Sequence, residues 1–194
     1  MTNKIYIYGA SGHGMVVSDI ARAVGYNELI LLDDSSGLKF SSDLEKHDIF
    51  IAIGDNAIRE RLTRKVEAAG FNVVSLIHPS VVVSPTATVG KGVVAMPQVV
   101  INARSTVGDG TILNTAAVIE HDCVVGMFAH VSPSASLAGN VILKDRVHFG
   151  IGSCAIQGVV VGYDSVVGAG SVVVRDVPDD VIVYGNPAKT GRHL

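Results

Sequence analysis

A six-residue spacing of apolar side chains runs without a break through residues 77–173. Fourteen of the seventeen residues at this spacing are isoleucine, leucine or valine. A helix would repeat near every 3.6 residues and a half-buried strand every two, so neither fits. The period predicts a parallel β-helix built from hexapeptide units. The series is Ile77, Val83, Val89, Ala95, Ile101, Val107, Leu113, Ile119, Val125, Val131, Leu137, Leu143, Phe149, Ala155, Val161, Val167 and Val173.

The residue two positions before each aliphatic residue, from Val83 onward, is valine, alanine, serine, threonine or cysteine. A short strand buries this small residue and the aliphatic residue, and it points the residue between them outward. The next three residues, often glycine, asparagine or aspartate, turn a corner. Three units then make an 18-residue triangular coil, and successive coils stack at a strand spacing of about 4.8 Å. We expect about five coils, because a single coil cannot bury its apolar face.

Residues 1–76 follow a different pattern, in which short apolar runs alternate with amphipathic stretches. This alternation predicts a small, Rossmann-like parallel α/β sheet, followed by the all-β helix. We therefore divide the chain into two domains, 1–76 and 77–194. The expected strands are 4–8, 29–32, 49–53 and 71–76, and the expected helices are 15–24 and 57–69.

A glycine-rich turn, Gly9-Ala10-Ser11-Gly12-His13-Gly14, separates the first expected strand from the first expected helix. Such a turn lets backbone N–H groups and a helix N-terminus approach a pyrophosphate. Asp33 and Asp34 end the second strand, where carboxylates can accept hydrogen bonds from a ribose or a base, and Gly54 follows the third. The spacing differs from the dinucleotide G-x-G-x-x-G, and a tight turn with a solvated acidic pair is the alternative. The domain is too short for a whole NAD, so we predict a nucleotide-sugar.

Histidines on the predicted β-helix carry the candidate chemistry. His130 and His148 are 18 residues apart, so they share one outward column on adjacent coils. His121 lies at a corner, is followed by Asp122, and has Gly139 one coil later, which leaves space beside it. A neutral imidazole oriented by a carboxylate can accept a proton near pH 7. The alternatives are an exposed turn histidine and a set of zinc ligands.

Composition narrows the class of protein. The net charge of −3 gives no basic surface for nucleic acid. The sequence shows no signal peptide and no apolar run long enough to insert in a membrane, so we expect a cytoplasmic protein. Cys123 and Cys154 give no disulfide framework, and Cys123 falls at an inward core position. Outward apolar columns predict a closed homotrimer; they are Val82, Val100, Val118 and Val172, and Val124, Ile142 and Val160.

The hexapeptide repeat, the IEHD segment and the terminal GNPAK motif resemble the left-handed β-helix acyltransferases. With YGASGHG and LLDD, nearly the whole chain resembles the UDP-4-amino-sugar N-acetyltransferases of bacillosamine biosynthesis, which belong to a sialic acid O-acetyltransferase-like family. The resemblance implies transfer of an acetyl group from acetyl-CoA, as co-substrate, to the 4-amino group of UDP-2-acetamido-4-amino-2,4,6-trideoxyglucose. It also implies a trimer and no metal.

The same resemblance assigns roles to individual residues. His121 matches the general base, and Asp122 stands where the family has glutamate. The acetyl-CoA contacts match His130, Ile151, Gly168 and Ala169. The UDP-sugar contacts match Ser11, Gly12, His13, Asp33, Asp34 and Gly54. Three alternatives stay open: O-acetylation of sialic acid, N-acetylation of a GDP-linked amino sugar, and a non-catalytic scaffold that binds nucleotide-sugars.

Overall fold

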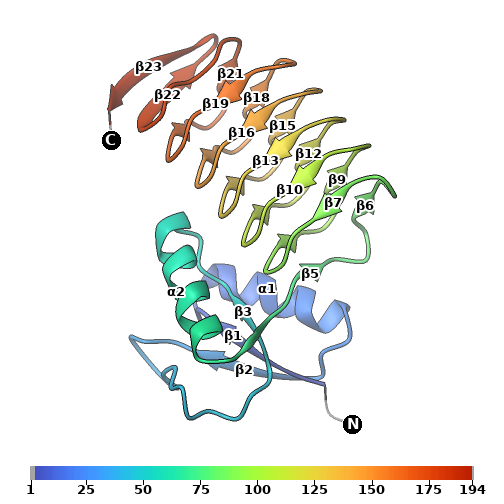
Figure 1. The fold of residues 1–194 in the computed structure, drawn as a ribbon, viewed down its shortest axis with the longest axis vertical. Coiled ribbons are helices and arrows are strands. Elements are labelled where there is room, and N and C mark those ends of the chain that lie inside the picture. The colour runs from blue at the N-terminus through green and yellow to red at the C-terminus, as the bar shows by residue number, and fades with distance from the viewer. Residues whose placement is uncertain (1–2, 194) are drawn as a thin grey trace.

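The computed structural model describes residues 3–193, with the backbone alone for Arg192 and His193. It contains a small α/β sheet domain followed by a long stack of triangular coils, as Figure 1 shows. Both predicted fold classes are confirmed. Within the described residues, neither helix has the length and apolar composition needed to cross a membrane.

The N-terminal domain is a four-stranded parallel sheet in the order β2-β1-β3-β4. The strand order reverses beside β1, so the loops after β1 and β3 flank the crevice where ligands bind in open α/β sheets. The elements are β1 (Lys4–Tyr8), α1 (Gly12–Ala23), β2 (Glu28–Leu32), β3 (Asp48–Ile51), α2 (Asn56–Ala68) and β4 (Asn72–Val73).

Most expected elements lie within two residues of their predicted bounds, and two differ by more. Helix α1 begins at Gly12 rather than at residue 15, so the second half of the glycine-rich turn is helical. The single strand expected over residues 71–76 was wrong, because β4 joins the N-terminal sheet while β5 (Leu76–Ile77) pairs with the solenoid. The break falls at Ser75, whose hydroxyl donates to Gly90 O and accepts from Val93 N.

The coils of the solenoid consist of two-residue strands in three parallel sheets, and the longer strands β22 and β23 end one of them as an antiparallel pair. We call the sheet of β5, β8, β11, β14, β17, β20 and β22 the domain-facing sheet; β23 extends it. The first outer sheet contains β6, β9, β12, β15, β18 and β21, and the second contains β7, β10, β13, β16 and β19. The stack reaches about six turns rather than five, because terminal strands extend it. The bounds are β6 (Val82–Val83), β7 (Thr88–Val89), β8 (Val94–Ala95), β9 (Val100–Ile101), β10 (Thr106–Val107), β11 (Ile112–Leu113), β12 (Val118–Ile119), β13 (Val124–Val125), β14 (His130–Val131), β15 (Ser136–Leu137), β16 (Ile142–Leu143), β17 (His148–Phe149), β18 (Cys154–Ala155), β19 (Val160–Val161), β20 (Val166–Val167), β21 (Val172–Val173), β22 (Val181–Gly185) and β23 (Ala188–His193).

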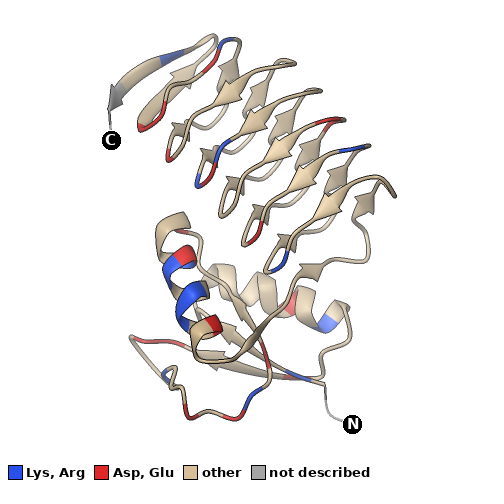
Figure 2. Ribbon diagram, in the orientation of Figure 1, with Lys and Arg blue, Asp and Glu red and all other residues tan. Residues whose placement is uncertain are grey.

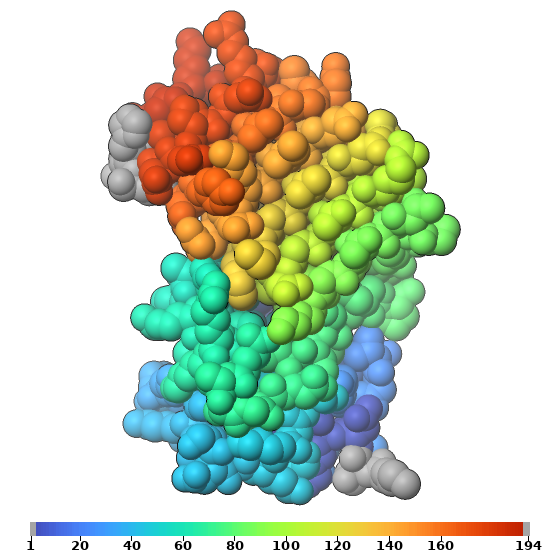
Figure 3. Space-filling view, viewed as in Figure 1, coloured from blue at the N-terminus to red at the C-terminus, as the bar shows by residue number. Residues whose placement is uncertain are grey.

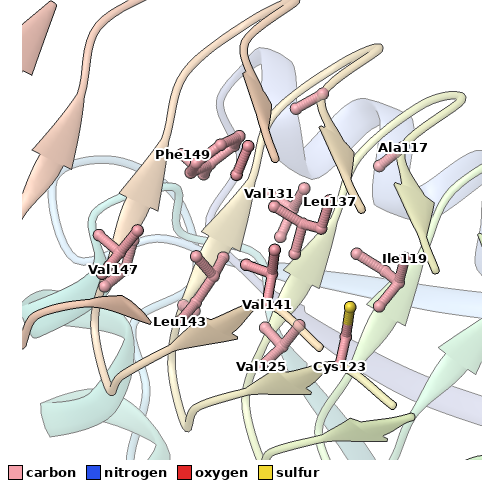
Figure 4. Packing of buried hydrophobic residues seen from close by; sticks show 14 of the residues in the cluster. Ala117, Ile119, Cys123, Val125, Val131, Leu137, Val141, Leu143, Val147 and Phe149 are labelled. Carbon is pink, nitrogen blue, oxygen red and sulfur yellow. The ribbon is translucent and has the colours of Figure 1, made fainter. Parts of the chain in front are cut away.

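The solenoid core alternates small and aliphatic side chains as the sequence pattern predicts. Figure 4 shows the side chain of Cys123 directed into this core near Ile119, Val125 and Val141. Its thiol is fully buried and donates to Ala138 O at 3.2 Å, and burial raises its pKa. Cys123 is therefore a core residue, as expected from its inward position.

The N-terminal domain packs against the domain-facing sheet. Val17 and Ile20 of α1 share one buried cluster with Val94, Met96 and Ile112 of the solenoid. Figure 3 shows the domain seated against the green and yellow coils. Figure 2 shows that charged residues concentrate on α2 and in the N-terminal domain, while the coils carry theirs mostly at corners. The N-terminal domain thus covers the outward residues of the domain-facing sheet, whereas it leaves those of the first outer sheet uncovered.

Candidate functional site

His121 and Asp122 lie at the corner between the first and second outer sheets, which we call the outer corner. His121 Nδ1 lies 2.7 Å from Asp122 Oδ2, so the shorter aspartate still reaches the ring. The His121 side chain is 53% exposed. A carboxylate bonded at Nδ1 holds the hydrogen there and leaves the Nε2 lone pair free. This tautomer is the one that can accept a proton from an approaching group.

The next coil leaves room for the His121 ring. A Cβ on Gly139 would lie 2.5 Å from His121 Cε1 and 2.6 Å from Nε2, which no real side chain allows. Glycine at this corner therefore lets the imidazole lie against the backbone of the following coil. The predicted space beside His121 is confirmed.

The glycine-rich turn joins β1 to α1. Its glycines have different roles: a Cβ on Gly14 would lie 1.8 Å from Gly9 O, whereas a Cβ on Gly12 would meet nothing within 4 Å. Gly14 is therefore required by the fold, and Gly12 faces open space. Ser11 is the N-cap of α1, but its side chain makes no capping bond. The Ser11 hydroxyl and the first N–H groups of α1 are hydrogen-bond donors that can bind an anion.

The acidic pair lies beside this turn. Asp33 accepts hydrogen bonds from the N–H groups of Ala10, at 3.3 Å, and Ser35, at 2.8 Å. The Ser35 hydroxyl is the first of the groups that hold the pKa of Asp33 down to about 2. Asp34 accepts from the Tyr8 hydroxyl at 2.7 Å. Both carboxylates line a cavity of about 240 Å³ between the ends of β1, β2 and β3; its other lining residues are Tyr8, Gly9, Ser35, Ile53, Ile58, Arg61 and Leu62.

Gly54 lies at the mouth of a second cavity, of about 410 Å³, between the start of α2 and the solenoid. The other lining residues are Asp55, Asn56, Ala57, Arg146, His148, Asp164 and Val166. Gly54 thus faces the solenoid, while Asp33 and Asp34 line the smaller cavity within the domain. Both cavities are lined by residues that follow the carboxyl ends of strands, after β1, β2 and β3 in the smaller one and after β3 in the larger one.

Arg59, a residue of α2 that the sequence pattern did not single out as a site residue, is 1% exposed. Its guanidinium donates to Gly110 O at 2.7 Å and Phe128 O at 2.7 Å on the solenoid. It also donates to Gly54 O at 3.1 Å and to Asn56 Oδ1 at 2.9 Å. Burial lowers its pKa to about 10, which leaves it charged at neutral pH. Arg59 therefore ties the Gly54 loop to two solenoid coils.

His130 and His148 share a column, as their spacing predicts, with ring centroids 4.9 Å apart. Within one chain, the N-terminal domain packs over this part of the sheet. Burial is the main cause that lowers the pKa of His130 to about 3 and that of His13 to about 4. His13 Nε2 and His130 Nδ1 are buried and have no hydrogen-bond partner among the described residues. Both rings are neutral and each keeps an unsatisfied nitrogen.

The remaining cofactor candidates lie at the corner between the domain-facing sheet and the first outer sheet. Ile151 is 59% exposed, and its carbonyl accepts from Gly170 N at 2.8 Å, so it stacks directly on the turn that contains Gly168 and Ala169. His130 occupies the adjoining face. His121 lies at a different corner of the triangular coil.

The structure therefore does not bring all the candidate residues together in one chain. The nucleotide candidates and the coenzyme candidates lie on or beside the domain-facing sheet. His121 lies at the outer corner, which is the corner opposite that sheet. Among residues 3–191, whose side chains the structure describes, no three histidine, cysteine, aspartate or glutamate side chains come close enough to hold a metal ion.

Comparisons with solved structures bear on this arrangement. The chain is 40% identical to a Caulobacter crescentus protein, PerB, solved with CoA and GDP-perosamine; the match covers 99% of both chains with a TM-score of 0.92. The chain belongs to the family of β-helix sugar N-acetyltransferases. A model of the PglD N-terminal domain matches residues 4–66. The acetyltransferase domain of Neisseria gonorrhoeae PglB, solved with acetyl coenzyme A, is 40% identical over 98% of this chain and 100% of that one, with a TM-score of 0.91.

Curated members of the family match over shorter stretches. A GDP-perosamine N-acetyltransferase of Escherichia coli O157:H7 is 30% identical over 72% of this chain, and the chain spans 65% of that relative's length. A UDP-N-acetylbacillosamine N-acetyltransferase of Bacillus subtilis is 33% identical over 48% of this chain and 51% of its own length. Both GDP-sugar and UDP-sugar enzymes therefore occur among its relatives.

Proposed function

We propose that this chain transfers the acetyl group of acetyl-CoA to the amino group of a GDP-linked 4-amino sugar. The observation that carries the proposal is the exposed His121–Asp122 pair, with Nδ1 held at 2.7 Å and Nε2 free. Family membership supplies the reaction class. The motif resemblance favoured a UDP-linked acceptor, whereas similarity over 99% of the chain to the protein solved with GDP-perosamine favours the GDP-linked alternative.

The cavity beside Asp34 is compatible with guanine. Asp34 lines this cavity, and its Oδ2 accepts from the Tyr8 hydroxyl at 2.7 Å. Guanine presents two neighbouring donors, N1–H and the 2-amino group, whereas uracil presents N3–H alone. A carboxylate can accept both guanine donors, because each ionised oxygen has lone pairs available. Gly12 and the start of α1 would then receive the pyrophosphate.

In the proposed reaction, the neutral sugar amine attacks the thioester carbonyl and forms the new C–N bond. His121 Nε2 takes the proton from the amine nitrogen, and Asp122 stabilises the resulting imidazolium. Collapse of the tetrahedral intermediate breaks the C–S bond and releases the CoA thiolate, which takes a proton from His121. The buried Cys123 has no part in this direct transfer.

A second copy of the chain completes the site in this proposal. The opposite positions of His121 and the domain-facing sheet support a site formed by His121 of one chain and the nucleotide and coenzyme residues of its neighbour. The exposed outward residues Val82, Val124 and Ile142 supply an apolar surface for such contacts. We propose a homotrimer that acts in the cytoplasm, where acetyl-CoA and nucleotide-sugars are available.

The trimer gives a direct expectation. Val118 lies outward on β12, beside the outer corner, and is only partly buried. Replacing it with aspartate puts a charge into the proposed interface, so the sedimenting species should shift from about 60 kDa toward the 20.2 kDa monomer. Sedimentation velocity at micromolar concentration measures this. A wild-type chain that is monomeric under these conditions contradicts the trimer.

Gly12 gives an expectation for the acceptor site. Because a Cβ there meets no protein atom, Gly12→Val should keep the fold but occupy the space proposed for the pyrophosphate. We expect the KM for the nucleotide-sugar to rise about tenfold or more, a loss of about 1.4 kcal/mol, with the KM for acetyl-CoA nearly unchanged. Thermal unfolding is the control. Equal increases in both KM values would refute a separate acceptor site at this turn.

The experiment that tests the function measures CoA release from acetyl-CoA with matched acceptors. GDP-, UDP- and dTDP-linked 4-amino sugars are compared, each with a no-acceptor control. The proposal expects the highest kcat/KM with the GDP-linked sugar. A preference for the UDP-linked sugar supports the second candidate, acetylation of a UDP-linked bacillosamine precursor. Release that is equal with and without acceptor contradicts acetyl transfer to sugars.

A further inference from the structure

Arg104 contacts the same carboxylate as His121. It lies one coil before Asp122 at the outer corner, 18 residues earlier in the chain. Its Nε donates to Asp122 Oδ1 at 2.6 Å, and its Nη2 donates to Oδ2 at 2.7 Å. His121 Nδ1 bonds that same Oδ2 at 2.7 Å. One carboxylate oxygen is therefore shared by a guanidinium and an imidazole on neighbouring coils.

We propose that Arg104 is a positioning residue, which orients Asp122 toward His121 and limits how strongly that carboxylate stabilises the protonated ring. The inference rests on the proposed role of His121 as the base. In this proposal, Arg104 helps to determine the pH range in which His121 is unprotonated and can accept a proton.

The backbone holds this arrangement in register. Arg104 and Asp122 both have left-handed backbone conformations, with φ of 59° and 61°. Arg104 N donates to Thr86 Oγ1 at 3.1 Å, and Asp122 N donates to Ala103 O at 2.9 Å. The corner therefore repeats from coil to coil, and the planar guanidinium fork fixes both oxygens of the carboxylate. A lysine would supply the charge without the two-point orientation.

The charges around His121 determine the direction of the effect. Arg104 is the first of the groups that lower the pKa of Asp122 to about 2, and a less basic carboxylate is a weaker acceptor for the imidazolium. Glu120 is the neighbouring acidic residue: its Oε2 accepts from the backbone N–H of His121 at 3.3 Å, and its Oε1 accepts from Asn102 Nδ2 at 3.0 Å. From the next coil, Gly139 and Asn140 bring no titratable group. Removing Arg104 takes away a positive charge and frees Asp122, and both changes favour protonated His121.

The fold should tolerate the change. The Arg104 side chain is 66% exposed, and exposed ion pairs contribute little to stability. Arg64 offers a matched control: it is 67% exposed and also bonds a carboxylate, Glu60, but it lies on α2. Replacing Arg64 also removes one positive charge and one exposed ion pair with a carboxylate, but at a position far from His121 in the chain.

The test compares Arg104→Met, Arg104→Lys and Arg64→Met with the wild type. Histidine labelled with 13C at Cε1 reports each titration by NMR, and the His121 signal is the one missing in His121→Ala. We expect the His121 midpoint to rise by about 0.5 pH unit in Arg104→Met, the size expected for removing a unit charge at short range across water. The acidic limb of kcat/KM should move with it. Arg104→Lys should move less, and Arg64→Met should not move.

The two proposals fail in different ways. An unchanged His121 midpoint in Arg104→Met overturns the inference and leaves the proposed base untouched. A lower kcat with an unmoved acidic limb also overturns it, because that result indicates only a structural role. If His121→Ala retains full activity, the proposed function fails, and the NMR titration still decides whether Arg104 and His121 are linked through Asp122.

Discussion

His121→Ala is expected to lower kcat by a factor of about 10²–10⁴, the usual contribution of a general base. The alanine removes the one imidazole whose Nε2 is free at the outer corner while Asp122 holds its Nδ1. The fold should persist, because the ring is more than half exposed and Gly139 beside it makes no demand on the side chain. Steady-state kinetics of CoA release measure the change.

The pH profile extends this prediction. In the wild type, kcat/KM should rise with pH through the range where imidazole and the sugar amine lose their protons. The alanine variant should lose the limb that belongs to the imidazole. His78→Ala is the matched control, since His78 also follows a solenoid strand but lies in the first coil and bonds Ser80. Turnover near the wild-type value in His121→Ala, or an acetylated Cys123 trapped by mass spectrometry, is incompatible with direct transfer by this base.

Arg59→Met should produce the largest loss of stability. The guanidinium bonds carbonyl oxygens of the Gly54 loop and of two solenoid coils, and it is almost completely buried. Methionine fills part of the volume but leaves those acceptors without donors, each at a cost of about 1–3 kcal/mol. We expect a loss of about 3 kcal/mol in the free energy of unfolding, measured by denaturant titration at matched protein concentration.

The Arg59 variant should also bind the acceptor more weakly than the coenzyme, because the Gly54 loop loses its anchor to the solenoid. Arg64→Met, on the same helix but exposed, is the control and should unfold like the wild type. A change below about 0.5 kcal/mol in Arg59→Met would mean that the interdomain contact does not depend on this residue.

The solenoid was predictable because each coil repeats the same packing problem. Only a six-residue period buries both the small residue and the aliphatic residue of every unit in one core. The register then placed His130 above His148 and Gly139 beside His121 without further information. The C-terminal end of the stack was not predicted, because Ile182 pairs with the solenoid through β22, a strand that lies outside the hexapeptide series.

The covered face of the solenoid was not predictable from the repeat. The period identifies which residues point outward, but it does not say which of three similar faces receives another domain. The spacing placed His130 on an outward column, and only the structure shows that the N-terminal domain packs over this sheet. Arg59 could have indicated the contact between α2 and the solenoid. It lies on the same face of α2 as Leu62 and Val66, so it places a charge within the apolar stripe of that helix.

The contact between Arg104 and Asp122 could be predicted only in part from the sequence. Its position 18 residues before Asp122 follows from the coil length, so the two residues could be placed on one column from the sequence. Whether the side chains meet depends on the left-handed backbone at both corners and on rotamers that spacing does not determine. The same spacing pairs Arg146 with Asp164, where both carboxylate oxygens again lie 2.6 Å from the guanidinium.

Product analysis tests the central proposal most directly. A GDP-linked 4-amino sugar is incubated with acetyl-CoA and either the wild type or His121→Ala, and the nucleotide-sugar is isolated for mass spectrometry and NMR. We expect one acetyl group on the 4-amino nitrogen, formed in equal amount to the CoA released, and formed far more slowly with the variant. CoA release without acetylated sugar, or acetylation at a sugar oxygen, would contradict it.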